Sequence, residues 1–100
     1  LVDLGGDIAV IGPHIDGTPW RIGIRNPSAR ESSIADIELE CGGLATSGDY
    51  ERCLIVEGKR YSHIVDPLSG WPVAGFSSVS VSAPSALIAG AACTTAMLLG

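Results

Sequence analysis

A histidine and an aspartate lie at the end of a strand-like segment, directly before a turn formed by residues 67–70. An imidazole ordinarily titrates near pH 6.5, so His63 is a candidate for moving a proton, and catalytic groups gather where strands meet turns. Alternation along a strand places His63 on one face with Tyr61 and Val65, while Asp66 points elsewhere. The alternative is a structural histidine, packed on a sheet and hydrogen-bonded to a carbonyl.

Four segments of the chain together form a pattern far more specific than any one of them alone. In order and spacing they resemble the ApbE family of flavin transferases over the whole chain, and members of that family are much longer. Residues 1–100 are therefore expected to be the C-terminal portion of a single ApbE-like flavin transferase domain. The segments are LVDLGGDI (1–8), ATSGDYER (45–52), GKRYSHIVDP (58–67), and SVSV (78–81) with the apolar stretch that ends in LLG (98–100).

The resemblance implies an enzyme that transfers FMN from FAD to a threonine hydroxyl of a target flavoprotein, with Mg²⁺ bound and AMP released. His63 is implied as the base or phosphate partner, and Ile64 as an apolar contact to the flavin nucleotide. Small residues permit close approach of a ligand to the backbone, although a bulge or turn without any ligand is the alternative at each. These cofactor-binding candidates are Gly5, Gly6, Ser47 and Gly48.

The C-terminal segment departs from the family pattern at one position. Similar proteins usually carry Ala-Asp-Ala-x-x-Thr-Ala, whose Asp and Thr lie on one helical face and ligate magnesium. Residues 89–95 keep the threonine as Thr94 but have Gly90 in place of the carboxylate. Glycine inside a helix costs about 1 kcal/mol relative to alanine, so stability alone does not explain Gly90. A second departure is Leu68, where a polar or basic residue often follows the Asp-Pro pair.

Gly90 separates two hypotheses about function. The first is an active FAD:protein FMN transferase, in which water, pyrophosphate oxygens or residues of the absent N-terminal part supply the missing metal ligand. The second is an FAD-binding inactive paralogue, or a flavin carrier, that lost transfer chemistry with the carboxylate. An unrelated α+β domain is the third alternative, and it requires four coincidental motif matches.

The fold is predicted as α+β, a mostly antiparallel sheet of about six strands with a C-terminal helix packed on it. Alternating apolar residues indicate the strands, and the glycine in Glu57-Gly58-Lys59 predicts a tight hairpin. Ser82 or Ser85 can cap the helix, whose first turn accepts Pro84. The expected strands and helix are Leu1–Ile11 around the Gly5-Gly6 interruption, Trp20–Arg25, Ile34–Leu39 continuing into 42–47, Tyr50–Val56, Arg60–Val65, a short strand at 79–81, and the helix Ala86–Leu99.

Composition limits the partners. A formal charge of -5 with six scattered basic residues argues against nucleic acid and against an anionic membrane surface. Three cysteines without metal-ligand spacing argue against zinc, so free thiols are expected, with a Cys41–Cys53 bridge as the alternative in an exported protein.

Localisation is left open. Residues 86–100 are too short an apolar stretch to cross a bilayer. The opening inside an apolar run predicts a fragment, so membrane association is expected only through an anchor upstream of Leu1. Members of the ApbE family are often exported and lipid-anchored in the periplasm, but others are not.

Overall fold

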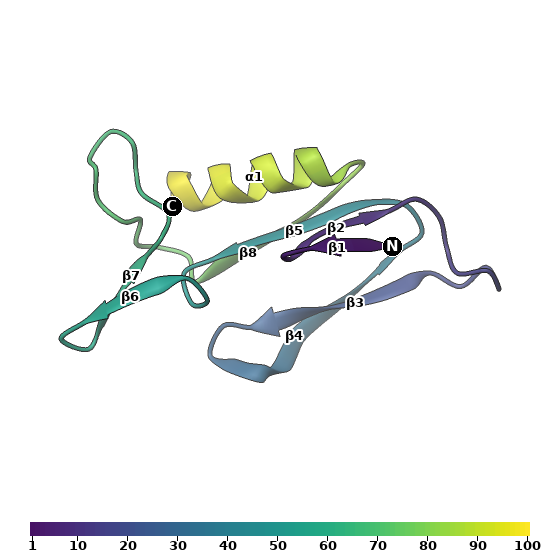
Figure 1. Cartoon of the computed structure of the whole chain (residues 1–100), viewed down its shortest axis with the longest axis horizontal. Coiled ribbons are helices and arrows are strands. Elements are labelled where there is room, and N and C mark those ends of the chain that lie inside the picture. Colours follow the sequence, from purple (N-terminus) through teal and green to yellow (C-terminus); the bar gives the residue numbers. More distant parts are fainter.

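A computed structural model describes all residues from 1 to 100 as eight strands followed by one helix (Figure 1). Every strand pair is antiparallel. The α+β class predicted from the sequence is thus confirmed, although two more strands form than expected. The elements are β1 (Val2–Leu4), β2 (Asp7–Val10), β3 (Trp20–Asn26), β4 (Ala29–Leu39), β5 (Gly42–Gly48), β6 (Cys53–Val56), β7 (Lys59–Ser62), β8 (Ser78–Ala83) and α1 (Ala86–Leu99).

A four-stranded sheet in the order β1-β2-β5-β8 forms the centre of the structure. Helix α1 covers one face of this sheet, and the β3–β4 hairpin lies against the other (Figure 1). On the hairpin side, Val10, Leu39 and Leu44 form a buried cluster. On the helix side, Ala45, Ala89 and Cys93 form a second one. Alternation of side chains along β5 therefore supplies both layers.

The first predicted strand, Leu1–Ile11, is wrong as a single element, because it folds back on itself. Gly5 and Gly6 have φ angles of +69° and +101° and form a two-residue turn between β1 and β2, with Leu4 opposite Asp7. Two consecutive positive φ angles are what a tight hairpin of this kind requires, and Gly-Gly meets that requirement without strain. The interruption is thus a turn and not a bulge.

The segment 42–48 forms a strand of its own, β5, at the centre of the sheet. Its small residues resemble loop composition, but they allow α1 to approach closely. A Cβ atom built on Gly43 would lie 2.3 Å from the backbone nitrogen of Ala86, at the start of the helix. The absence of a side chain at this buried position therefore sets the distance between helix and sheet.

The β6–β7 hairpin forms at the predicted turn. Glu57 and Gly58 both have positive φ angles, 50° and 78°, and Val56 lies opposite Lys59. The strands are shorter than the predicted Tyr50–Val56 and Arg60–Val65, because β6 begins at Cys53 and β7 ends at Ser62. His63 consequently lies just beyond the strand rather than within it.

Helix α1 spans the predicted residues, Ala86–Leu99, and begins at the cap residue Ser85. The Ser85 Oγ accepts a hydrogen bond from the backbone nitrogen of Ile88 at 3.2 Å. The sequence predicted Pro84 in the first helical turn. In the structure Pro84 precedes the cap residue and therefore lies outside the helix. Of the two predicted capping serines, Ser85 is the one used, while Ser82 is an exposed residue of β8.

Loss of this cap should destabilise the protein measurably. Ser85→Ala is expected to lower the free energy of unfolding by about 0.5–2 kcal/mol, because the amide of Ile88 loses its acceptor. Urea denaturation followed by circular dichroism measures the change. Ser82→Ala is the matched control and should leave the denaturation midpoint unchanged; equal losses in both variants would contradict the capping role.

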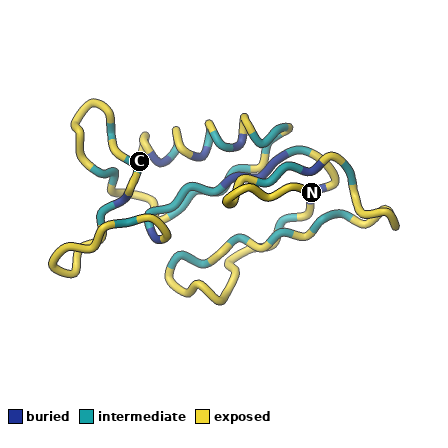
Figure 2. The backbone as a smooth tube through the Cα atoms, viewed as in Figure 1, coloured by how far each residue is buried: buried dark blue, intermediate teal, exposed yellow.

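Most of the buried residues lie between the central sheet and the elements that cover it (Figure 2), and Tyr50 and Ser62 are buried outside that layer. Only ten of the hundred residues are buried, and many large apolar side chains are exposed, among them Leu68, Trp71, Leu87 and Leu99.

All three cysteines are free thiols, so the alternative Cys41–Cys53 bridge is absent here. The single helix, α1, does not have the length and apolar character that a membrane span requires.

Candidate functional site

His63 lies at the end of β7, held by the segment that precedes β6. Its Nδ1 is 2.9 Å from the carbonyl oxygen of Arg52. A carbonyl oxygen can only accept, so Nδ1 carries the proton and donates it. In the neutral ring, Nε2 then has a free lone pair, which suits it to accept a proton. The ring is exposed, so it has the carbonyl contact of a structural histidine without being packed in the core.

A cleft brings His63 together with four other residues singled out from the sequence. The β1–β2 turn contributes Gly5 and Gly6, and the end of β5 contributes Ser47 and Gly48. Two segments more than forty residues apart in the chain, 5–6 and 47–48, thus meet where His63 lies. The opposite wall comes from β3, through Ile22, Gly23, Ile24 and Arg25.

The segment after β5 gives the cleft its polar groups. Arg25 forms an ion pair with Glu51 across the cleft, and Arg52 also lines it. Burial, reinforced by the neighbouring carboxylate of Glu51, raises the pKa of Tyr50 above its ordinary value. A Cβ atom on Gly48 would lie 2.5 Å from Cε1 of Tyr50. Gly48 is therefore required by the packing of the Tyr50 ring, whatever ligand approaches it.

The two candidate metal positions, Gly90 and Thr94, lie in α1, on the other face of the sheet. The hydroxyls of Ser47 and Thr94 share a hydrogen bond of 3.1 Å, and Ser47 Oγ is also 3.1 Å from the buried Cys93 Sγ. Gly90 lies one helical turn before Thr94, and the closest atom outside this part of the helix to a Cβ built on it is Asp7 Oδ2, at 3.5 Å. Ser47 therefore joins the cleft to the helix face that carries Thr94.

Three predicted positions do not line the cleft. Ile64 is half-buried, and its carbonyl oxygen accepts a hydrogen bond from the amide of Val73. Asp66 accepts hydrogen bonds from the amide of Leu68 and the hydroxyl of Ser69. Asp66 therefore shapes its own turn, and Leu68 is almost fully exposed.

Sequence reasoning assigned no role to several residues that the fold places at the site. Asp7 belongs to the motif at residues 1–8, and Arg25 and Tyr50 lie in predicted strands, so the sequence indicates no separate role for them. Arg25 and Tyr50 line the cleft, whereas Asp7 lies on the helix side of the sheet beside Gly90. Nothing in their local sequence distinguishes them, because these positions depend on how the strands and the helix pack. The one available signal was an aspartate directly after a glycine turn, where a carboxylate is presented at the start of a strand.

Known proteins are similar to this chain in sequence and in fold. The profile of the ApbE family matches residues 1–100, the full length of the chain. The chain belongs to the ApbE family. The FAD:protein FMN transferase of Salmonella typhimurium is 39% identical over 102 residues, which cover all of this chain and 29% of that protein.

Two solved ApbE structures are similar to this chain in fold. The ApbE protein of Thermotoga maritima superposes with a TM-score of 0.89 at 43% identity, covering 95% of this chain and 30% of that one. The apo flavinyl transferase ApbE of Pseudomonas stutzeri gives a TM-score of 0.74 at 38% identity, covering 98% and 30%. The chain thus spans about three tenths of the length of its ApbE relatives.

Proposed function

We propose that this protein is an FAD:protein FMN transferase that moves FMN from FAD to a threonine hydroxyl of a target flavoprotein. The observation that carries the proposal is the cleft in which His63 meets Gly5, Gly6, Ser47 and Gly48. The names of the ApbE relatives support the same activity. The glycine turn and the end of β5 present backbone without bulky side chains, which suits a nucleotide phosphate or ring held against it.

The proposed reaction assigns His63 the proton. The threonine oxygen attacks the FMN phosphorus of FAD, a new P–O bond forms, and the pyrophosphate P–O bond breaks to release AMP. Nε2 of His63 accepts the hydroxyl proton, since Nδ1 is already occupied by the carbonyl of Arg52. The same hydrogen bond holds the ring in orientation during proton transfer.

The residues present fit a magnesium ion in the chemistry of their donors. No three His, Cys, Asp or Glu side chains converge on a metal position, but magnesium keeps several waters and needs only one or two carboxylates. Thr94 and Ser47 offer hydroxyl oxygens, and Asp7 a carboxylate, around the helix face that includes Gly90. When bound, the ion would neutralise charge that develops on the pyrophosphate.

We also propose that residues 1–100 are the C-terminal portion of a larger flavin transferase domain. The lengths of the relatives support this, as do the exposed apolar side chains of α1 and of the 68–76 loop. Large contiguous patches of exposed apolar residues usually mark a contact surface. The remaining part of the domain would supply further nucleotide contacts.

Intact mass spectrometry of a threonine-bearing acceptor protein tests the function directly. After incubation with the full-length protein, FAD and Mg²⁺, we expect a mass increase equal to one FMN. The increase should disappear when either FAD or Mg²⁺ is omitted, or when the acceptor threonine is changed to alanine. An unmodified acceptor, in the presence of bound FAD and a positive-control transferase, would instead support the inactive paralogue or carrier.

A further inference from the structure

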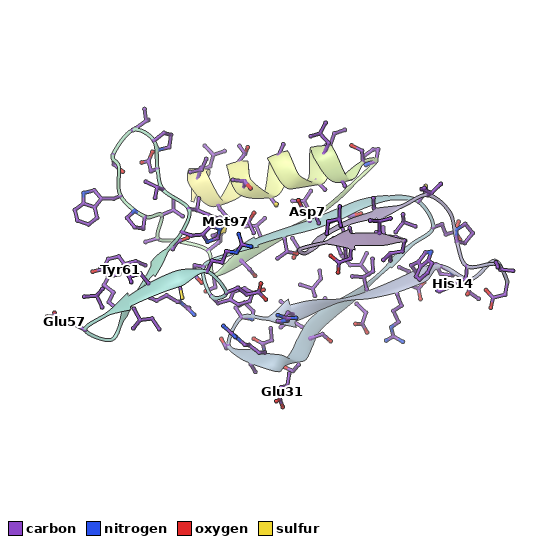
Figure 3. The ribbon with its side chains drawn as sticks, in the orientation of Figure 1. Asp7, His14, Glu31, Glu57, Tyr61 and Met97 are labelled. Atoms are coloured by element: carbon purple, nitrogen blue, oxygen red, sulfur yellow. The ribbon has the colours of Figure 1, made fainter.

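The side chain of Asp7, from β2, lies against helix α1 beside Gly90, which has no side chain of its own. A Cβ atom at Gly90 would lie 3.5 Å from Asp7 Oδ2 and within 4 Å of nothing else outside its own helical turn. That distance is an ordinary van der Waals contact. In Figure 3, Asp7 lies between the central sheet and the helix. The Asp7 carboxylate, carried by β2, is therefore in contact with the point where a side chain at position 90 of the helix would begin.

The packing of the two elements places Asp7 there. Asp7 is the first residue of β2, and its neighbour Ile8 packs against the cluster on the hairpin face. Successive side chains point to opposite faces, so Asp7 is directed toward the helix. Ala45 and Ala89 are completely buried between sheet and helix, and their small size keeps the two layers close.

Oxygen donors from three elements gather on this face. Thr94 is four residues after Gly90, hence on the same side of α1, and its hydroxyl is hydrogen-bonded to that of Ser47 in β5. The Asp7 carboxylate belongs to none of the three ion pairs in the structure. It is also exposed, so it is free to bind a cation. Carboxylate and hydroxyl oxygens are hard ligands of the type that Mg²⁺ prefers.

We propose that Asp7 replaces the helix carboxylate that Gly90 lacks and, with Thr94, holds the divalent cation of the flavin-transfer reaction. This inference rests on the proposed function. An aspartate at position 90 would place a second negative charge beside Asp7, and adjacent like charges repel. The chain has one carboxylate at this place, carried by the strand and not by the helix.

Metal affinity, measured without turnover, tests the inference. The full-length protein is titrated with Mn²⁺, with and without FAD, and the free-ion electron paramagnetic resonance signal reports binding. Asp7→Asn should weaken binding by at least about tenfold, since even an outer-shell partner of a metal ligand contributes about 10- to 100-fold. Glu31→Gln removes the same charge at an exposed position near the start of β4 and should leave the affinity unchanged (Figure 3).

A second variant distinguishes the loss of a metal ligand from a loss of folding in Asp7→Asn. In Asp7→Asn/Gly90→Asp the carboxylate returns from the helix side, and the 3.5 Å contact leaves room for it. We expect affinity to return to within a few fold of the parent protein. Unchanged affinity in Asp7→Asn, a double variant as weak as Asp7→Asn, or a parent protein that binds no Mn²⁺ in either condition would overturn the inference.

Flavin transfer by the parent protein, measured in parallel, separates the two proposals. If the parent modifies the acceptor while Asp7→Asn keeps its Mn²⁺ affinity, the role of Asp7 is refuted and the transferase function stands. If the parent modifies nothing but binds Mn²⁺ in a manner dependent on Asp7, the metal site stands and the transferase function is refuted.

Discussion

His63→Ala in the full-length protein should lower the rate of FMN transfer by about 10²- to 10⁴-fold, the usual contribution of a general base. The ring is exposed, and its only hydrogen bond is to the carbonyl oxygen of Arg52, so the fold should persist. The rate is followed as the growth of the FMN-modified acceptor mass over time. Thermal unfolding by circular dichroism checks that the variant remains folded.

His14 provides the matched control for this experiment. It is the other histidine of the chain, exposed in the loop between β2 and β3, where its ring stacks on Trp20. Figure 3 shows it at the end of the molecule away from the β6–β7 hairpin. His14→Ala should transfer FMN at the parent rate. A His63→Ala protein that is folded and transfers FMN normally would remove His63 from the mechanism.

Gly43→Ala should be the most destabilising single-methyl change in the chain. Its Cβ would lie 2.3 Å from the nitrogen and 2.5 Å from the Cα of Ala86, and backbone atoms cannot rotate away as a side chain can. Overpacking of this kind costs about 1–3 kcal/mol, occasionally more. The helix must move off β5 to relieve the contact, so transfer activity should fall as well. Urea denaturation of the full-length protein measures the loss.

Gly12→Ala is the corresponding control. No atom lies within 4 Å of a Cβ built at Gly12, and its φ angle is outside the left-handed region. The free energy of unfolding should therefore stay within about 0.5 kcal/mol of the parent value. If Gly43→Ala behaved like Gly12→Ala, the close approach of α1 to the sheet would be contradicted.

The regular elements of this protein could be predicted where side-chain pattern and turn chemistry agree. The strand from Trp20 alternates cleanly, the turn at Glu57-Gly58 has the glycine that a tight hairpin needs, and Ala86–Leu99 is helical as predicted. The prediction failed where composition was ambiguous. Gly5-Gly6 fits a bulge as well as a turn, and the small residues of β5 fit a loop as well as a buried strand.

The candidate site could be predicted only in part. Motif spacing identified His63, Gly5, Gly6, Ser47 and Gly48, which line one cleft. The role of Ile64 stays a prediction, and so does metal binding at Thr94. The contact of Asp7 with the Gly90 position could not be predicted, because it depends on the distance between α1 and β2.

The sequence by itself determined the class of fold, the family and the residue types available for chemistry, because these follow from local periodicity, turn residues and ordered motifs. Only the tertiary structure decided which of those residues meet. Gly43, Ala45 and Ala89 have little or no side chain, so helix and sheet pack closely enough to bring Asp7 beside Gly90 and Ser47 beside Thr94. Such contacts join positions far apart in the chain, and no local pattern encodes the distance between layers.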